Sequence, residues 1–396
     1  MSEFHLVELR RRLQVIGLSL YFGFSVGSMA AVPIPEAKAQ QSKPALSAPM
    51  SRLSLQQRRQ LEALLTEEVQ KKVNHQKRIA GQGRDVRVRV TLDPKRSMVI
   101  ADFSKNFLPS ANGGAWEKIT QEIDNAIYYF LGDDISYVGT EFLIEGKSIL
   151  EYYPDKLPVT PRKSTSQPFR VTPTVVVAAG HGYYFNHGSL SWRTQRDPHN
   201  GIIEDFLTPS YANELASWLQ QRSQVTVRND VRSASLELHG RTGYPWVQMA
   251  ARYHLRDYYP NNLEICCSDP DDRSDLREYD EDIRSRPLFA NFIGANTLIH
   301  LHSNGDDNAA IRGARVYVYP DRPVDSALAA SVLCSMREVI QAQPAYATFP
   351  VATAPHTANH GENRIATMPS VIIETAFHTN ASDALALQDP IFRESL

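Results

Sequence analysis

Three short apolar runs, each followed by a histidine or a glutamate, constrain the fold of this chain more than any other feature. They are Val175–Ala179 before Gly180-His181-Gly182, Leu298–Leu301 before His302, and Ser370–Ile373 before Glu374. Runs of this kind are typical of the buried strands of parallel sheets. Open α/β sheets bind their ligands at the carboxyl ends of such strands. We therefore predict an α/β domain with its site at these strand ends.

A fourth polar residue, Glu204, lies just before a predicted helix. Thr208 and Pro209 are typical of a helix N-cap and a first helical residue. The positions that follow place apolar side chains three and four residues apart: Tyr211, Leu215, Trp218 and Leu219. Glu204 is therefore either a surface carboxylate or a ligand presented near the start of this helix.

The residue types at these positions suit metal-assisted hydrolysis. Two histidines and one carboxylate (His181, His302 and Glu204) form the donor set of a catalytic zinc site, which keeps a fourth position for water. Glu374 supplies the general base that such a water needs. The H-E-x-x-H helix of other zinc proteases is absent. Taken singly, His181 also fits an ordinary loop residue, and Glu374 also fits a carboxylate paired with a buried arginine.

From about Thr174 to its end, the chain resembles the zinc-dependent N-acetylmuramoyl-L-alanine amidases of the Amidase_3 type. The segments that carry the resemblance are "VVVAAGHG", "GIIEDFLTPSYANELASWL", "RPLFANFIGANTLIHLHSNG", "IRGARVYVY" and "ATMPSVIIETAFHTNASDALAL". The resemblance implies a mixed six-stranded sheet with helices on both faces. It also implies Zn²⁺ held by His181, Glu204 and His302, with Glu374 catalytic. The implied reaction is cleavage of the amide bond between N-acetylmuramic acid and L-alanine in peptidoglycan.

The chain departs from this family pattern in several places. Ala178-Ala179 replaces the usual D-P before the G-H-G turn, and Tyr183 replaces the glycine after it. An insertion of roughly forty residues lies within residues 231–285. It is rich in aspartate and glutamate, and we predict a solvated acidic loop, with a substrate-groove rim as the alternative. Family members continue into a closing helix, so the end at Leu396 predicts that this helix is missing.

Three further residues near the proposed ligands carry weaker predictions. His300 would share a strand face with His302, where it fits a partner of a ligand better than a ligand. His378 could bind or polarise substrate. Arg364 matches a recurrent family arginine, for which packing or pairing is the default interpretation. Cys266 and Cys267 receive no metal role.

The start of the chain predicts export. Residues 1–39 combine Arg10-Arg11-Arg12, an uncharged stretch from Leu13 to Val32, and an A-x-A site at Ala37-Lys38-Ala39, which together indicate a signal peptide. A retained membrane anchor and a buried helix are the alternatives. We predict a periplasmic or cell-envelope protein with no membrane span after signal cleavage.

Residues 40–84 predict a polar linker followed by an amphipathic helix. Ser54 and Gln57 form a capping box, and apolar residues then recur at helical spacing: Leu61, Leu64, Leu65, Val69 and Val73. Residues 156–171, which contain three prolines, predict a second linker, and residues 172–396 form the predicted catalytic domain.

Between these linkers, residues 85–155 predict a small α+β domain. Alternating valines from Val86 indicate a strand, a helix is expected from about 116 to 131, and a strand pair is expected at 137–144 and 149–153. The segment "ADFSKNFLPSANGGAWEKITQEIDNAIYYFL" resembles the spore-germination (GerMN) domain. It holds no candidate catalytic group. We therefore expect a binding or positioning module that serves a cell-wall or activator protein.

Charge and cysteine content exclude other classes of protein. Lysine and arginine number 42 against 44 aspartates and glutamates, a net charge of -2, so no basic field exists to hold nucleic acid. Three cysteines cannot build a disulfide scaffold. Two alternatives to the amidase remain open: a zinc hydrolase of another peptide or amide bond, and a non-catalytic wall-binding protein.

Overall fold

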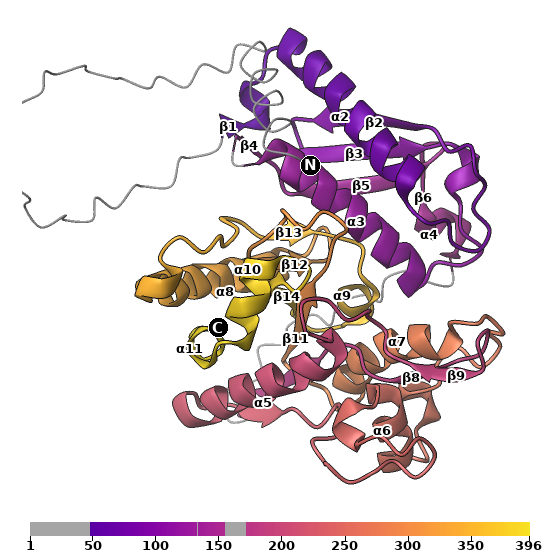
Figure 1. The fold of residues 1–396 in the computed structure, drawn as a ribbon, viewed down its shortest axis with the longest axis vertical. Coiled ribbons are helices and arrows are strands. Elements are labelled where there is room, and N and C mark those ends of the chain that lie inside the picture. Colours follow the sequence, from indigo (N-terminus) through magenta and orange to yellow (C-terminus); the bar gives the residue numbers. More distant parts are fainter. Residues whose placement is uncertain (1–47, 133, 155–171) are drawn as a thin grey trace, which may run out of the picture.

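The computed structural model describes residues 48–132, 134–154 and 172–396. The predicted signal peptide and the predicted linker at 156–171 lie outside these residues. Within them, a ten-stranded sheet runs in the order β10-β7-β11-β14-β12-β13-β5-β3-β2, with β6 beside β5 (Figure 1). No helix in the described ranges is both long enough and apolar enough to cross a membrane.

Six of these strands come from residues 172–396. They are β7 (Thr174–Ala179), β10 (Thr226–Arg228), β11 (Thr297–Asn304), β12 (Arg315–Val318), β13 (His356–Thr357) and β14 (Ser370–Phe377). The three predicted apolar strands are neighbours, because β11 pairs in parallel with both β7 and β14. β12 runs antiparallel to β14. The predicted mixed six-stranded sheet is therefore confirmed.

Helices cover both faces of this sheet, as predicted. One face packs against α5 (Glu204–Arg222), α8 (Pro323–Ala342), α10 (Ala381–Gln388) and α11 (Pro390–Ser395). The other packs against α6 (Ala251–Tyr258) and α7 (Arg277–Phe292). Successive side chains of β7 point to opposite faces of the sheet, which explains the two layers. Val175 and Val177 belong to the first core, whereas Val176 and Ala178 belong to the second.

Residues 48–154, which we call the N-terminal unit, have their own hydrophobic core. The unit contains β1 (Ala48–Pro49), α2 (Leu55–His75), β2 (Val88–Asp93), β3 (Met98–Phe103), α3 (Gly114–Leu131), β4 (Ile135–Ser136), β5 (Gly139–Ile144), β6 (Lys147–Ser148) and α4 (Ile149–Tyr152). The predicted capping box of Ser54 and Gln57 is present at the start of α2. Four of the five predicted apolar residues of α2 are buried, and the fifth, Leu64, is partly buried against the same core. Helix α3 is also confirmed.

The N-terminal unit continues the sheet of residues 172–396 through a single short strand. β13 pairs in parallel with β5, where Thr357 lies opposite Gly139. A Cβ atom at Gly139 would overlap the side chain and backbone of Thr357, so only glycine permits this approach. The unit (indigo to magenta in Figure 1) therefore lies directly against the rest of the molecule.

One predicted strand and one predicted helix start are wrong. The expected strand at 149–153 is helix α4, because Ser148 and Glu151 form a capping box that starts a helix directly after β6. Helix α5 begins at Glu204 and not at Thr208. Pro209 is tolerated inside it because Arg232 donates to the carbonyl of Asp205, which a proline cannot bond.

The prediction of a solvated acidic loop is wrong for the end of the insertion. Glu281 and Asp282 belong to α7 and are buried. Each carboxylate pairs with a guanidinium: Glu281 Oε2 lies 2.5 Å from Arg252 Nη2, and Asp282 Oδ2 lies 2.6 Å from Arg286 Nη1. Paired acids can be buried at a tolerable cost, and composition alone does not reveal such pairing.

The remaining elements are short and complete the C-terminal part. They are the hairpin strands β8 (Tyr184–Asn186) and β9 (Ser191–Arg193), helix α9 (Gly361–Ile365), and the 3₁₀ helices η4 (Trp246–Gln248), η5 (Leu263–Ile265) and η6 (Pro344–Tyr346). In the N-terminal unit, η1 (Met50–Arg52) and η2 (Lys105–Phe107) are also 3₁₀ helices.

Candidate metal centre and active site

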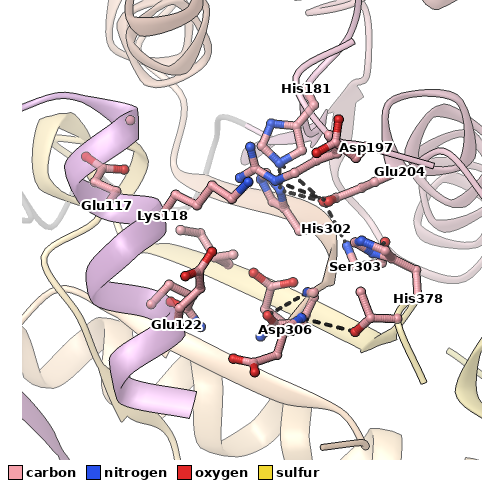
Figure 2. Close-up of a pocket in the computed structure, with 18 of the residues that line it drawn as sticks. Glu117, Lys118, Glu122, His181, Asp197, Glu204, His302, Ser303, Asp306 and His378 are labelled. Carbon is pink, nitrogen blue, oxygen red and sulfur yellow. Dashed lines mark hydrogen bonds and ion pairs between the residues drawn. The ribbon is translucent and has the colours of Figure 1, made fainter. Parts of the chain in front are cut away.

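The structure brings His181, Glu204 and His302 together at the carboxyl ends of β7 and β11 (Figure 2). His302 Nδ1 lies 3.1 Å from His181 Nε2 and 3.2 Å from Glu204 Oε1. His181 Nε2 lies 3.3 Å from the same carboxylate oxygen. All three side chains are buried. Within the described ranges, this is the one group of three such side chains placed to hold a metal ion.

Local backbone geometry explains how the two histidines come so close. Gly180 directly follows β7, and a Cβ atom there would overlap the imidazole of His302. His181 has a φ of 61°, a left-handed conformation that turns the chain sharply after the strand. Because left-handed geometry is costly for a residue with a side chain, its presence at this position is typical of a functional site.

The spacing of the three donor atoms fits a tetrahedral metal ion. Ligands about 2.0–2.1 Å from zinc in a tetrahedron lie about 3.3 Å from one another. The three observed separations, 3.1, 3.2 and 3.3 Å, agree with that geometry. Glu204 Oε2 is buried and has no hydrogen-bond partner among the described residues. The residues present therefore fit a metal site with two nitrogen donors and one oxygen donor.

Each histidine is oriented by a hydrogen bond on its other ring nitrogen. Gln195 Oε1 lies 2.9 Å from His181 Nδ1, and Glu362 Oε2 lies 2.9 Å from His302 Nε2. Partners of this kind set the tautomer and the ring orientation of metal ligands. They leave His181 Nε2 and His302 Nδ1 facing the centre of the cluster.

The two orienting residues share one buried support. Gln195 Nε2 donates to Asp282 Oδ2 over 2.8 Å, and Arg286 donates to both Asp282 and Glu362. Arg286 is completely buried. Sequence reasoning missed Gln195 and Glu362, because each lies outside the apolar runs and neither has a motif spacing to the ligands. Only the folded chain brings them to the histidine rings.

Asp205, next to Glu204, organises the loops around the site. Its carboxylate accepts hydrogen bonds from the backbone N–H groups of Gly182, Gln195 and Arg196. The turn after β7 and the segment that carries Gln195 are thus tied to the first turn of α5. This explains why two polar residues stand side by side at a buried helix start.

Glu204 is held in its ionised form. Burial alone would raise the pKa of this carboxyl group, but His181, His302 and Arg196 outweigh burial and hold the pKa well below its usual range. Arg196 Nε lies 3.6 Å from Glu204 Oε2. An ionised carboxylate is the form that binds a metal ion.

Glu374 lies beside the cluster, in the second half of β14. It faces His302 across the β11–β14 pairing, and both line the same cavity of about 250 Å³. Its Oε2 atom is buried without a hydrogen-bond partner among the described residues. Burial raises the pKa of Glu374 to about 7, partly opposed by His302. A carboxyl group with such a pKa can both accept and donate a proton near neutral pH.

The three residues with weaker predictions lie in different surroundings. His300 is fully buried, and burial lowers its pKa to about 3; its Nδ1 atom lies 3.8 Å from Glu362. His378 lines the cavity and its Nδ1 atom lies 3.0 Å from Ser303 Oγ. Arg364 bonds Asn359, and its Nη2 atom lies 3.7 Å from Glu117, which is a pairing contact. None of the three belongs to the cluster of donor atoms.

The fold and the site together define an α/β protein with a buried His–Glu–His cluster that could hold a metal ion at the carboxyl ends of parallel strands. The sequence profile of the N-acetylmuramoyl-L-alanine amidases, Amidase_3, matches residues 175–396. The chain therefore belongs to this family. No curated protein sequence matches the chain.

Solved structures similar to this chain include several amidases. The N-acetylmuramoyl-L-alanine amidase from Clostridium difficile 630 is 16% identical, with a TM-score of 0.38, over 57% of this chain and 90% of that one. The catalytic domain of CwlV, an amidase from Bacillus (Paenibacillus) polymyxa var. colistinus, is 18% identical, with a TM-score of 0.33, over 57% and 91%. The CwlD amidase from Clostridioides difficile, solved in complex with the GerS lipoprotein, is 17% identical, with a TM-score of 0.35, over 57% and 92%.

Proposed function

We propose that this protein is a zinc-dependent N-acetylmuramoyl-L-alanine amidase that hydrolyses the amide bond between N-acetylmuramic acid and the first L-alanine of peptidoglycan. The observation that carries the proposal is the tetrahedral spacing of His181, Glu204 and His302 beside the buried carboxyl group of Glu374. Membership of the amidase family supports the choice of substrate.

His181, Glu204 and His302 would hold the metal ion. Zinc in such a site supplies a Lewis acid that activates water and polarises the scissile carbonyl. Gln195 and Glu362 keep the two imidazole rings turned toward the centre of the cluster. The buried Arg286–Asp282 pair in turn keeps these two residues in place.

Glu374 moves the proton in this mechanism. Its carboxylate accepts a proton from the attacking water and then donates it to the nitrogen of the departing L-alanine. Burial favours this role, because the raised pKa places the proton-accepting and proton-donating forms close in free energy at neutral pH. His378 lies on the wall of the same cavity, where it would contact substrate.

The proposal includes the location and the partners of the protein. Peptidoglycan lies outside the cytoplasmic membrane, which agrees with the signal peptide predicted at residues 1–39. We also propose that the N-terminal unit meets a cell-wall component or an activator protein. Its resemblance to the spore-germination domain supports this part of the proposal.

Products from purified peptidoglycan test the reaction. The full chain, supplied with Zn²⁺, should release stem peptides that begin with a free L-alanine amino group and leave intact glycan strands, as identified by mass spectrometry. The Glu374→Gln variant is the matched control and should release little. Products cut inside the peptide would instead favour a zinc hydrolase of another bond, and the absence of any product would favour a wall-binding protein.

A further inference from the structure

One wall of the catalytic cavity comes from outside the family-matched region. Helix α3 of the N-terminal unit contributes Gly114, Glu117, Lys118, Gln121 and Glu122 to the lining of the cavity that holds the metal-binding cluster. These positions recur at spacings of three and four and therefore share one helix face. In Figure 2 this helix runs along one side of the cavity, and the side chain of Lys118 extends toward the cluster.

Helix α3 is fixed in this place by polar contacts with residues 172–396. Gly114 N donates to Asp280 Oδ1 over 2.7 Å, and the Glu117 carboxylate accepts from Gly361 N over 2.8 Å. Further along the same face, Gln121 Nε2 donates to the hydroxyl of Tyr317 over 2.7 Å. These contacts run along the helix, so its cavity face is held in a defined orientation.

A buried group at the far end of this face completes the attachment. Asn125 is fully buried; its amide donates to Asn304 Oδ1 over 3.3 Å, and its oxygen accepts from Arg315 Nη1 over 2.8 Å. Asn304 belongs to β11, the strand that carries His302. The N-terminal unit is therefore joined by hydrogen bonds to the strand that bears a proposed metal ligand, and it acts as a fixed wall of the site.

Lys118 differs from the other charged residues of this wall in its contacts. The cavity lining contains two cations, Lys118 and Arg196. Arg196 is occupied, because it donates to Tyr279 and pairs with Glu204. Lys118 is exposed and makes no hydrogen bond or ion pair with the residues that the structure describes. Its ammonium group is thus available to a bound molecule.

The acidic residues of the wall are engaged in other ways. Glu117 faces Arg364 and His360. Glu122 accepts from Gln76 over 2.8 Å and interacts with Lys118 through charge alone, without an ion-pair contact. On this side of the cavity, Lys118 is therefore the cation that can bind an anion. In a muramoyl peptide, the lactyl carboxylate of the sugar is consumed in the amide bond. The carboxylates of such a substrate consequently lie on its peptide.

We propose that α3 is a substrate-binding wall of the active site and that Lys118 is a specificity residue that binds a carboxylate of the peptide. The inference rests on the proposed amidase function and adds to it a preference for peptides with free carboxylates over amidated ones. A lysine pairs with an anion as a flexible point charge, so its contribution falls on substrate binding and leaves the chemical step unchanged.

The test compares two muramoyl peptides of the same sequence, one with free peptide carboxylates and one with these groups amidated. It uses the full chain with Zn²⁺ and the variant Lys118→Gln, which keeps a polar side chain, one atom shorter than lysine, and removes the charge. Lys147→Gln is the matched control, since Lys147 is exposed on β6 and does not line the cavity. Melting temperatures of both variants show whether they fold as the wild type does.

For the free-carboxylate peptide, Lys118→Gln should raise KM about five- to tenfold while kcat changes by less than about twofold. For the amidated peptide, KM should stay unchanged. Lys118→Glu should raise KM for the free-carboxylate peptide further, and Lys147→Gln should behave as the wild type. A rise in KM that is equal for both peptides, or absent for both, overturns the assignment.

A binding measurement separates this inference from the proposed function. If the wild type hydrolyses neither peptide, the amidase proposal fails. Calorimetric titration of both peptides into the Glu374→Gln chain, with and without Lys118→Gln, then tests Lys118 alone. A five- to tenfold loss of affinity, equal to about 1–1.4 kcal/mol of binding free energy, supports the assignment if it is confined to the free-carboxylate peptide. Equal affinities, or no binding at all, overturn it.

Discussion

His302 and Glu374 lie opposite each other in the register of the parallel strands β11 and β14. Residues paired in this way project from the same face of a sheet, so the pairing alone places a proposed metal ligand next to a proposed general base. The register shifts directly afterwards, because the next paired residues are Asn304 and Phe377, which places one extra residue, a β-bulge, on β14. Bulges often redirect side chains next to active sites.

The metal site is tested by removing one ligand. His302→Ala should lose most of the zinc that the wild type binds, about one ion per chain, because one of three protein donors is gone. Elemental analysis of purified protein measures the metal content. His75→Ala, which changes an exposed histidine of α2, should retain full zinc. Full occupancy in His302→Ala would contradict the ligand assignment.

The role of Glu374 is tested by an isosteric change. Glu374→Gln should lower turnover by about 10²- to 10⁴-fold, because the amide cannot accept a proton. Zinc content and melting temperature should stay close to those of the wild type, since Glu374 Oε2 has no hydrogen-bond partner among the described residues. Glu338→Gln, an exposed change on α8, is the control. A stable, zinc-loaded and fully active Glu374→Gln enzyme would remove Glu374 from the mechanism.

Glu362 is expected to support both the metal and the fold. Glu362→Gln should weaken zinc affinity by about 10- to 100-fold, because His302 loses the charged partner that orients its ring. It should also lower the free energy of unfolding by roughly 3–5 kcal/mol, because Arg286 loses one of its two buried carboxylates. Zinc titration and chemical denaturation measure the two effects. If zinc affinity stays at the wild-type value, Glu362 does not tune the metal site.

The contact between α3 and α9 should make stability depend on pH. Burial raises the pKa of Glu117, but His360 and Arg364 outweigh burial, so the folded pKa is lower than the ordinary value of 4.5. A lowered folded pKa stabilises the protein above the ordinary pKa, and this contribution disappears as the pH falls through the folded pKa. Glu117→Gln should therefore lower the free energy of unfolding by about 1–3 kcal/mol at pH 7, and by progressively less below pH 4.5.

Urea denaturation of the wild type and Glu117→Gln at several pH values checks this expectation. Glu145→Gln, which alters an exposed residue after β5, should show no comparable pH-dependent difference. If the difference in the free energy of unfolding between the wild type and Glu117→Gln stays constant from pH 7 to acidic pH, the ionised carboxylate contributes nothing specific to the contact.

Much of the site could be predicted from the sequence, because the information is local to each strand. An apolar run indicates a buried parallel strand, and the polar residue that follows it must lie at the sheet edge where ligands bind. His181, His302 and Glu374 meet this description, and the structure places all three around one cavity. The helix that begins at Glu204 needed one correction, since the support for Pro209 comes from Arg232, distant in the sequence.

The sequence by itself thus determined the α/β sheet and the residues at its functional edge, because hydrophobic periodicity is a property of each segment alone. Only the tertiary structure decided which residues hold them in place. Hydrogen bonds between separate segments of the chain bring Gln195 to His181, Glu362 to His302, and the buried Arg286 to Glu362. Likewise, the placement of Lys118 on the cavity wall follows from the packing of α3 against β11 and α9, which no local pattern encodes.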